Sequence, residues 1–240
     1  MLEKLDLPKA GKLLAGISFC MVSQFGHASE NDPWESWNLR VHAFNEHLDA
    51  AILRPVATTY VRVLPLVVRR GVSNVFGNIL DVTVLLNNVL QLKLGDAASD
   101  GGRILLNTTV GIGGLIDVAT EAGLERNYED FGQTLGKWGV GPGPYMVLPL
   151  FGPSNVRDTF GFFTDTFTNP MNSHDNTAVR NGAFVLQQVD RRVAALMVDS
   201  LMMGDKYLFT REAYIQQRQY LVLDGEVQDG WGDDEWDSWD

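Results

Sequence analysis

One stretch restricts the possible folds of this chain more than any other: Phe131 to Val156, which reads FGQTLGKWGVGPGPYMVLPLFGPSNV. It carries a single charge, Lys137, among six glycines and four prolines. The stretch is apolar enough to be buried, yet too interrupted by glycine and proline to form one helix or one regular strand. Irregular apolar backbone is tolerated where protein covers it or where it lines a cavity. This stretch is therefore the first candidate for function.

Helical patterns flank the stretch on both sides. Apolar residues recur at spacings of three and four in several segments, which predicts amphipathic helices. Pro65 is expected to kink or end the second helix, Arg69-Arg70-Gly71 to stop it, and a cap at Ser73 to start the third. We predict an all-α fold, a compact bundle of amphipathic helices with an irregular Gly/Pro-rich segment. The predicted helices cover residues 34–51, 54–68, 73–94, 96–109, 181–201 and 205–223.

The N-terminal residues are typical of an export signal. A lysine-bearing start is followed by an uncharged apolar run over residues 13–25 and by the small residues Gly26 and Ala28 of a cleavage site. A second interpretation takes Cys20, the only cysteine, as a lipid-modified residue. The residue before such a cysteine is usually small, and Phe19 is bulky. We therefore predict a signal peptide over residues 1–28, with lipidation at Cys20 as the alternative.

Charge is unevenly distributed along the 240 residues. The formal net charge is -11, and residues 226–240 hold seven acids and no base. The chain has no basic stripe, which excludes nucleic acid as an expected partner. We predict one helical domain over residues 29–225, followed by an acidic tail over 226–240 that is disordered when alone.

Motifs for nucleotide binding and catalysis are absent. Gly111-Ile112-Gly113-Gly114 lacks the later glycine of a dinucleotide fingerprint and the lysine of a P-loop, so these glycines indicate a helix end and a close crossing of backbones. No nucleophile elbow, zinc motif or cluster of the four histidines is present. Acids beside apolar turns, such as Asp117, Asp130, Asp158 and Asp165, are expected to cap helices. We predict no enzyme activity, no cofactor and no metal.

The third predicted helix carries asparagines, among them Asn78 and Asn87, in an otherwise apolar pattern. Uncharged amides on an apolar helix suit a polar lumen, although hydrogen bonds between helices explain most such residues. No segment is expected to span a bilayer, since spanning takes about 20 apolar residues and the longest uncharged run, 138–156, holds four prolines. Helical pieces of roughly 10 to 13 apolar residues match one leaflet.

The chain resembles the VacJ/MlaA family, the outer-membrane component of the Mla intermembrane phospholipid transport system. The resemblance extends from about Asn31 to Gly225. It is carried by NDPWESWN (31–38), FNEHLD (44–49), RPVA (54–57), SNVFGNI (73–79), NNVLQ (87–91), RILLNTTVGIGGLIDVAT (103–120), DFGQTLGKWGVGPGPYMVLPLFGPSNVRD (130–158) and KYLFTREAYIQQR (206–218).

This resemblance implies a ring-like helical protein in the inner leaflet of the outer membrane, on the periplasmic side, with a central amphipathic channel. Proteins of this kind remove phospholipids from the outer leaflet and pass them to a periplasmic lipid carrier (MlaC-like), often while bound to trimeric porins. A phospholipid has a charged head and two apolar tails, so its path needs polar and apolar walls together. The mixed asparagine and aliphatic helices are compatible with that requirement.

A tentative set of lipid-channel or gating residues follows from the asparagines and from the resemblance. Deleting Phe44-Asn45, or introducing bulky residues at Gly141 and Gly143, is expected to alter lipid flux. Trp138 and Tyr145 are candidates for the membrane interface. Two alternatives stay open, a structural or porin-binding outer-membrane protein and a periplasmic phospholipase. The predicted set is Phe44, Asn45, Asn78, Asn87, Gly141, Gly143 and Tyr145.

Overall fold

The computed structural model describes residues 32–200, 202 and 204–226, so Cys20, the predicted signal peptide and almost all of the acidic tail lie outside the described residues. Within them the chain is mostly helical, with one two-stranded sheet. The helices are α2 (Glu35–Leu48), α3 (Arg54–Val63), α4 (Leu66–Leu90), α5 (Leu94–Thr109), α6 (Val118–Glu121), α7 (Phe131–Lys137), α8 (Val156–Thr168), α9 (Thr177–Ala195) and α10 (Lys206–Val222), with π-helix η2 (Asp49–Leu53) and 3-10 helices η3 (Pro170–Ser173) and η4 (Val198–Ser200). The strands are β1 (Tyr145–Leu148) and β2 (Gly152–Asn155).

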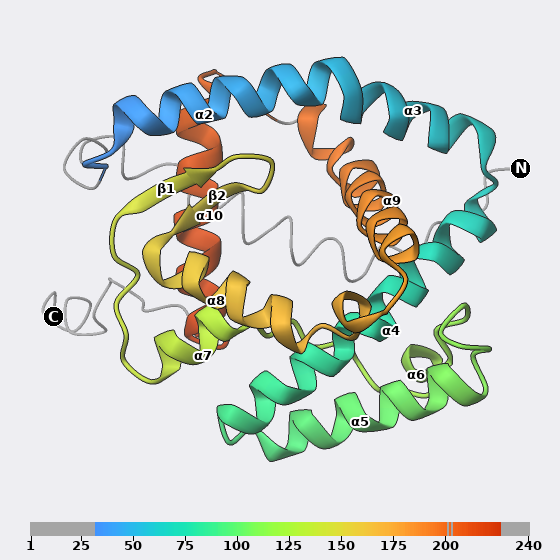
Figure 1. Cartoon of the computed structure of the whole chain (residues 1–240). Helices are drawn as coiled ribbons and strands as arrows, with labels where there is room; N and C mark the ends of the chain where they lie inside the picture. Colours follow the sequence, from blue (N-terminus) through green and yellow to red (C-terminus); the bar gives the residue numbers. More distant parts are fainter. Residues whose placement is uncertain (1–31, 201, 203, 227–240) are drawn as a thin grey trace, which may run out of the picture.

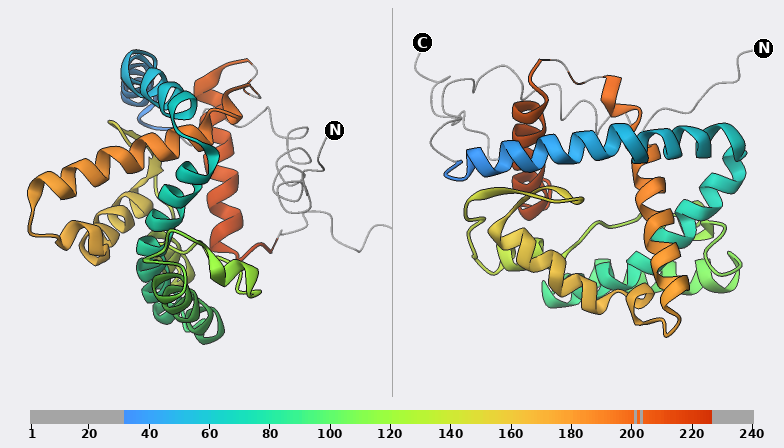
Figure 2. Two further views of the ribbon diagram at one scale, coloured as in Figure 1. Left: turned by 90° about the vertical axis from the view of Figure 1, so that its right-hand side faces the viewer. Right: turned by 45° about the horizontal axis from the view of Figure 1, so that its top comes forward.

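The elements are arranged as a ring, and the predicted ring-like helical fold is confirmed. In Figure 1, α2 and α3 form the top of the ring, and α4 runs down from the end of α3 to the bottom, where α5 lies beside it. Helices α7 and α8 and the hairpin close the other side. Figure 2 shows that the ring has depth, because α8 and α9 project to one side and α10 lies on the other. Contacts between α4 and α5, α7 and α8, and α3 and α9 join the segments.

The first two predicted helices are one continuous helical rod. α2 passes directly into η2, a single π-helical segment of five residues, and then into α3 at Arg54. Pro55 occupies the first turn of α3, where its missing N–H is tolerated. π-bulges allow a helix to absorb an irregular position without ending. The predicted break before Arg54 is therefore wrong, although the predicted start of the second helix coincides with the start of α3.

Pro65 ends α3, as predicted, but the predicted start of the next helix at Ser73 is wrong. Leu64 is extended, with φ -96° and ψ 128°, and α4 begins immediately after Pro65. The helix continues through Arg69-Arg70-Gly71, and Gly71 is buried beside Leu115. A Cβ atom there would lie 3.4 Å from Leu115 Cδ2. This is an ordinary van der Waals distance, and the glycine does not end the helix.

The Gly/Pro-rich stretch contains a short helix and a hairpin that the sequence analysis did not predict. Strands β1 and β2 pair antiparallel from Tyr145 opposite Asn155 to Leu148 opposite Gly152. Their turn has Pro149 followed by Leu150 at φ 73°, and the Phe151 N–H donates to the Leu148 carbonyl at 3.3 Å. This is the geometry of a type II turn, which normally has glycine or asparagine at the third position. Figure 1 shows the turn pointing toward the space that the ring encloses.

The distribution of polarity is the reverse of that in a water-exposed globular protein. Among the described residues, 17 buried residues are polar or charged and 10 are hydrophobic, whereas 37 large hydrophobic residues are exposed. A hydrophobic cluster within the described part of the chain contains Val41, Tyr145, Val147 and Tyr207. Exposed apolar area of this extent marks a surface that contacts another apolar phase or a partner. The interior of the ring wall is instead joined by polar contacts.

The crossing of α7 and α8 depends on a missing side chain. A Cβ atom at Gly161 would lie 2.3 Å from the Gly132 nitrogen, so Gly161→Ala should lower the free energy of unfolding by roughly 1 to 3 kcal/mol. Gly182 in α9 has open space around it, and Gly182→Ala should instead raise stability by up to about 1 kcal/mol. Chemical denaturation of both variants tests the pair. Equal effects of the two substitutions would contradict the close crossing.

Candidate functional site

Asn38 fixes the hairpin to α2. Its side-chain amide donates to the Tyr145 carbonyl at 3.2 Å and to Asp32 Oδ1 at 2.8 Å, and its oxygen accepts the Val147 N–H at 2.8 Å. The residue is fully buried. A side chain amide that bonds both to a strand N–H and to a strand carbonyl replaces the missing neighbouring strand. Sequence reasoning missed this role, although Asn38 lies in a quoted motif.

Asn45 repeats the same arrangement two turns further along α2. It donates to the Leu148 carbonyl at 3.0 Å and accepts the Leu150 N–H at 2.8 Å. Residues seven apart lie on one face of a helix, so Asn38 and Asn45 hold the whole of β1 and the turn. We call these two residues the asparagine pair. Phe44, its neighbour in the predicted set, is 51% exposed.

The asparagines predicted on α4 lie inside the wall of the ring. Asn87 is 2% exposed, donates to Asp165 Oδ1 at 3.0 Å and accepts the Thr134 hydroxyl at 2.8 Å. Asn78 is 8% exposed and donates to Thr108 Oγ1 at 3.0 Å. Both therefore connect α4 to other elements. That result agrees with the hydrogen-bonding explanation of such residues, and a role in a channel stays a prediction.

Asp165 is a titratable residue of this wall that contacts Asn87. It accepts the Phe131 N–H at 2.9 Å as well as the Asn87 amide, and burial raises the pKa of its carboxyl to about 6, against the lowering effect of these two hydrogen bonds. The expected capping role is wrong for this residue, since Asp165 lies in the last turn of α8 and accepts from the start of α7. Its burial could not be read from its place in the sequence.

A pH dependence of stability follows from this raised pKa. The folded state binds the proton of Asp165 more tightly than the unfolded state, so its contribution is full below pH 3.8 and is lost as pH rises toward about 6. The loss amounts to roughly 3 kcal/mol at most. We expect Asp165→Asn to flatten the decline of unfolding free energy between pH 4.5 and about 7, measured by denaturation at several pH values. Parallel curves for the variant and the wild type would contradict this assignment.

An ion-pair cluster closes α10 against α7 and α8. Arg218 donates to Asp130 at 2.6 and 2.9 Å and to Asp158 at 2.7 Å, and the Tyr214 hydroxyl donates to Asp158 at 2.5 Å. Despite the opposing effect of burial, the Arg218 guanidinium holds the pKa of both carboxyls below its usual range. Asp130 also accepts the Gln133 N–H and caps α7, as expected.

Of the two remaining acids that were expected to cap helices, Asp117 does so and Asp158 does not. Asp117 caps α6 through the Thr120 N–H, as expected, and hydrogen bonds hold its pKa at about 2 in spite of burial. For Asp158 the capping prediction is wrong, because Asn155 is the residue that caps α8. The glycines after α5 do mark a helix end and a close backbone approach, since a Cβ at Gly111 would lie 2.2 Å from the Ile116 carbonyl oxygen.

The remaining predicted site residues differ in how they are placed. Tyr145 lies in the hydrophobic cluster and is 4% exposed, whereas Trp138 is 54% exposed. Gly143 has φ 67°, and a Cβ there would lie 3.1 Å from Val156 Cβ. Gly141 has no neighbour within 4 Å, so a side chain there meets open space. Gly143 is therefore the sterically restricted member of this glycine pair.

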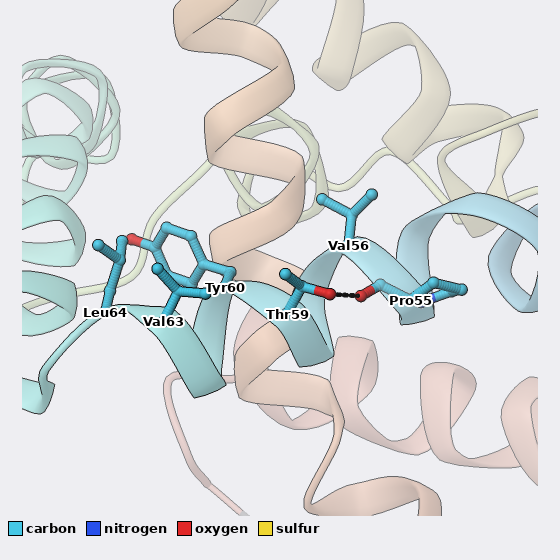
Figure 3. A pocket seen from close by; sticks show the side chains of 6 residues that line it. All are labelled: Pro55, Val56, Thr59, Tyr60, Val63 and Leu64. Atoms are coloured by element: carbon cyan, nitrogen blue, oxygen red, sulfur yellow. Dashed lines mark hydrogen bonds between the residues drawn. The ribbon is translucent and has the colours of Figure 1, made fainter.

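Two apolar hollows lie on the described part of the molecule. One, of about 330 Å³, is bounded by α4, η3 and α9, with Phe76, Ile79 and Met171 among its walls and His174 and Arg180 as its polar members. The other, of about 460 Å³, runs along α3 (Figure 3) and is lined by Pro55, Val56, Thr59, Tyr60, Val63 and Leu64. In this groove the Thr59 hydroxyl donates to the Pro55 carbonyl at 2.8 Å, which leaves an apolar lining.

No helix in the described ranges is long and apolar enough to cross a membrane. The residues that the structure describes also include no group of three or more histidine, cysteine, aspartate or glutamate side chains arranged to hold a metal ion.

Comparisons with known proteins agree on one family. The model of the MlaA lipoprotein family matches residues 30–221. An uncharacterized protein of Rickettsia typhi is 36% identical over 195 residues, which cover 80% of this chain and 78% of that protein. The intermembrane phospholipid transport system lipoprotein MlaA of Escherichia coli K12 is 35% identical over 215 residues, which cover 87% of this chain and 85% of that protein. One solved structure matches this chain with a TM-score of 0.71 at 36% identity, and the match covers 80% of this chain and 98% of that chain. It is described as the structural basis for maintenance of bacterial outer membrane lipid asymmetry.

Proposed function

Because the chain belongs to the MlaA lipoprotein family, we propose the following route and partners for its transport reaction. The protein is an intermembrane phospholipid transport protein of the bacterial outer membrane that maintains lipid asymmetry, and it is not an enzyme. Phospholipids leave the outer leaflet through the ring and pass to a soluble periplasmic lipid carrier, an MlaC-like protein. Trimeric porins hold the ring in the membrane.

The reversed polarity of the ring is the observation that supports this route most strongly. The described residues expose 37 large hydrophobic side chains and bury 17 polar or charged residues. An embedded ring needs apolar outer surfaces toward lipid tails, and its wall must satisfy its polar groups internally. A wall of this kind can offer a phospholipid both polar and apolar contacts along one path.

The hairpin is the element that we propose as the gate of this path. Its turn points toward the space inside the ring (Figure 1), and Leu150 and Phe151 at the turn are 57% and 42% exposed. Asn45 holds the turn through two hydrogen bonds, and Gly143 precedes β1 in a left-handed conformation. Phe44, Asn45, Gly143 and the hairpin thus form the proposed gating group. Asn78 and Asn87 support the wall beside it.

The domain organisation is part of the proposal. Residues 1–28 are a signal peptide, residues 29–225 are the transport domain, and residues 226–240 are an acidic tail that faces the periplasm. The acidic tail suits contact with a soluble partner more than with a membrane surface, since anionic headgroups repel it. Lipid anchoring at Cys20 is the alternative to cleavage after Ala28.

Transfer of lipid between purified components tests the proposed route. The full chain is purified in detergent, bound phospholipid is identified by mass spectrometry, and the complex is mixed with an MlaC-like carrier. We expect phospholipid to co-purify and to appear on the carrier. A protein without bound lipid, whose removal from cells leaves outer-leaflet phospholipid unchanged, would instead be a structural or porin-binding component.

A further inference from the structure

The turn between α3 and α4 lies in a segment that carries positive charge only. Residues 54–80 include four arginines and no lysine, aspartate or glutamate, in a chain whose formal net charge is -11. Three of these arginines, Arg62, Arg69 and Arg70, lie where α3 ends and α4 begins. We call these three residues the arginine corner. A local excess of one sign of charge attracts ions of the opposite sign.

The arginine corner has no ion-pair partner among the described residues. Arg62 and Arg70 are exposed, and neither takes part in an ion pair or a side-chain hydrogen bond within the part of the chain that the structure describes. Arg69 is half-buried, and its Nε donates to the Leu64 carbonyl at 3.1 Å. This bond fixes Arg69 at the end of α3 without neutralising its charge. The corner can therefore bind an external anion.

Apolar side chains are exposed beside these charges. Val63, Leu66 and Val67 are 69%, 50% and 80% exposed. Figure 1 and the right-hand view of Figure 2 show the turn between α3 and α4 at the outer edge of the ring. Arginine beside aliphatic residues is typical of surfaces at the level of lipid headgroups, where the charged end reaches the polar phase and the aliphatic parts stay in the apolar phase.

The apolar groove along α3 leads to this corner. The groove has a volume of about 460 Å³ and extends from Pro55 to Leu64, the residue whose carbonyl accepts from Arg69 (Figure 3). Ten residues of helix are about 15 Å long, which matches the hydrocarbon thickness of one leaflet, roughly half of 30 Å. The groove is therefore long enough for one acyl chain of a phospholipid whose headgroup lies at the arginines.

The hydroxyl of Tyr60 in this groove is buried and has no hydrogen-bond partner among the described residues. Burial and the Asp190 carboxylate raise the pKa of Tyr60, and the Arg69 guanidinium opposes them. Asp190 itself accepts the Ser73 hydroxyl at 2.6 Å. A buried polar group without a partner is destabilising. An oxygen atom of a ligand in the groove would satisfy the Tyr60 hydroxyl.

We propose that the arginine corner and the groove along α3 form a binding site for one anionic phospholipid on the outside of the ring. An acyl chain lies along α3, the phosphate lies at the arginines, and an ester oxygen accepts from the Tyr60 hydroxyl. The inference rests on the proposed function for the presence of a surrounding bilayer. It goes beyond that function because the lipid at this site is a bound ligand and not the transported lipid.

Charge explains the preference for an anionic lipid. The ammonium group of phosphatidylethanolamine neutralises its phosphate, whereas phosphatidylglycerol and cardiolipin keep a net negative charge, which unpaired arginines attract. Arginine also binds phosphate through paired hydrogen bonds. An acidic protein surface would satisfy the arginines but would leave the apolar groove and the Tyr60 hydroxyl unexplained. A phosphate that carries an acyl chain accounts for all three features together.

Photolabelling with two lipid probes tests the proposal on the unmodified protein. The full chain is reconstituted in phosphatidylethanolamine vesicles that contain a trace of phosphatidylglycerol or of phosphatidylethanolamine with a diazirine on one acyl chain. Each unpaired arginine should favour the phosphatidylglycerol probe about fivefold. We therefore expect stronger labelling of residues 55–64 by the phosphatidylglycerol probe than by the phosphatidylethanolamine probe. Equal labelling of these residues by the two probes would overturn the proposal.

Two further measurements identify the occupant of the site. Unlabelled phosphatidylglycerol should compete with the probe, whereas inorganic phosphate should compete no better than sodium chloride at the same ionic strength. Specific competition by inorganic phosphate would show a plain anion site, which overturns the lipid assignment. In isolated outer membranes the probe should label the same residues. Crosslinking of residues 55–70 to a protein there, with loss of the lipid adduct, would also overturn it.

Substitutions separate the headgroup preference from folding. Arg70→Gln should lower the ratio of the two labels about fivefold and leave thermal stability in detergent unchanged, because Arg70 is exposed and unpaired among the described residues. Arg40→Gln removes another exposed arginine, on α2, and should leave the ratio unchanged. Tyr60→Phe should weaken labelling by both probes without changing their ratio. A ratio in Arg70→Gln equal to that of the wild type would contradict the proposal.

The same experiments distinguish failure of this inference from failure of the proposed function. If phospholipid still passes to the carrier but the two probes label residues 55–64 equally, the anionic lipid site is wrong and the transport route stands. If the phosphatidylglycerol probe is preferred but no lipid is transferred, the transport route is wrong and the site stands.

Discussion

Replacing Arg218 by methionine should lower the free energy of unfolding by roughly 3 to 5 kcal/mol, the largest effect on stability that we expect for one side chain. Arg218 is 13% exposed and makes three hydrogen bonds to the carboxylates of Asp130 and Asp158. Methionine fills a similar volume but leaves Asp158, whose side chain is 9% exposed, as a buried carboxylate with less compensating charge. The reason for the loss is thus a buried acid that keeps only Arg157 as its ion-pair partner, and not a cavity.

Two further variants test this explanation. Arg218→Lys keeps the charge but cannot reproduce the paired hydrogen bonds to Asp130, so its loss should be intermediate. Adding Asp158→Asn to Arg218→Met should recover part of the stability, because the buried charge is then removed. Chemical denaturation near pH 7 is the measurement. If the double variant is no more stable than Arg218→Met, the buried-charge explanation fails.

The largest effect on function is expected from Asn45→Ala. The substitution removes the two hydrogen bonds that hold the turn of the hairpin. This loss should destabilise the turn position seen in the structure by roughly 1 to 3 kcal/mol. The population of this turn position, relative to other positions of the hairpin turn, should therefore fall about tenfold or more. Outer-leaflet phospholipid should rise in cells, since a gate that fails to pass lipid and a gate that leaks both lead to accumulation there.

Asn45→Asp and Asn172→Ala are the matched controls for this variant. Aspartate keeps the acceptor for the Leu150 N–H but loses the donor to Leu148, so an intermediate effect is expected. The Asn172 side chain donates to the Thr166 carbonyl at 2.9 Å, in η3 and outside the hairpin. Its loss should leave lipid asymmetry intact. Equal outer-leaflet phospholipid in wild type and Asn45→Ala, at equal protein abundance, would exclude the hairpin as gate.

The predicted set of site residues shows where sequence reasoning succeeded and where it stopped. Asn45 and Tyr145 were both chosen, and the structure brings them to the same hairpin, one at its turn and the other in the cluster beneath it. Asn38, Asp165 and Arg218 were not chosen. Each acts through partners more than 30 residues away, Asn38 to Tyr145, Asp165 to Phe131 and Arg218 to Asp130. A linear pattern contains no signal for such pairings.

The sequence by itself determined the features that depend on local chemistry. Helical periodicity, the stop at Pro65, the caps at Asp117 and Asp130 and the family motifs are set by neighbours within a few residues. These features were sufficient for the all-α class and for the family. They also showed that the Gly/Pro-rich stretch is too interrupted to be one helix.

Only the tertiary structure decided which face of each element is covered. The same apolar residues could have formed a core, but closure into a ring turns many of them outward and buries charged residues such as Arg103, which is 0% exposed. Whether glycine ends a helix, as after α5, or lets one pass a neighbour, as at Gly161, depends on what lies beside it. The hairpin likewise exists because α2 supplies the asparagine pair that holds it. These outcomes follow from contacts between distant segments, which local sequence patterns do not encode.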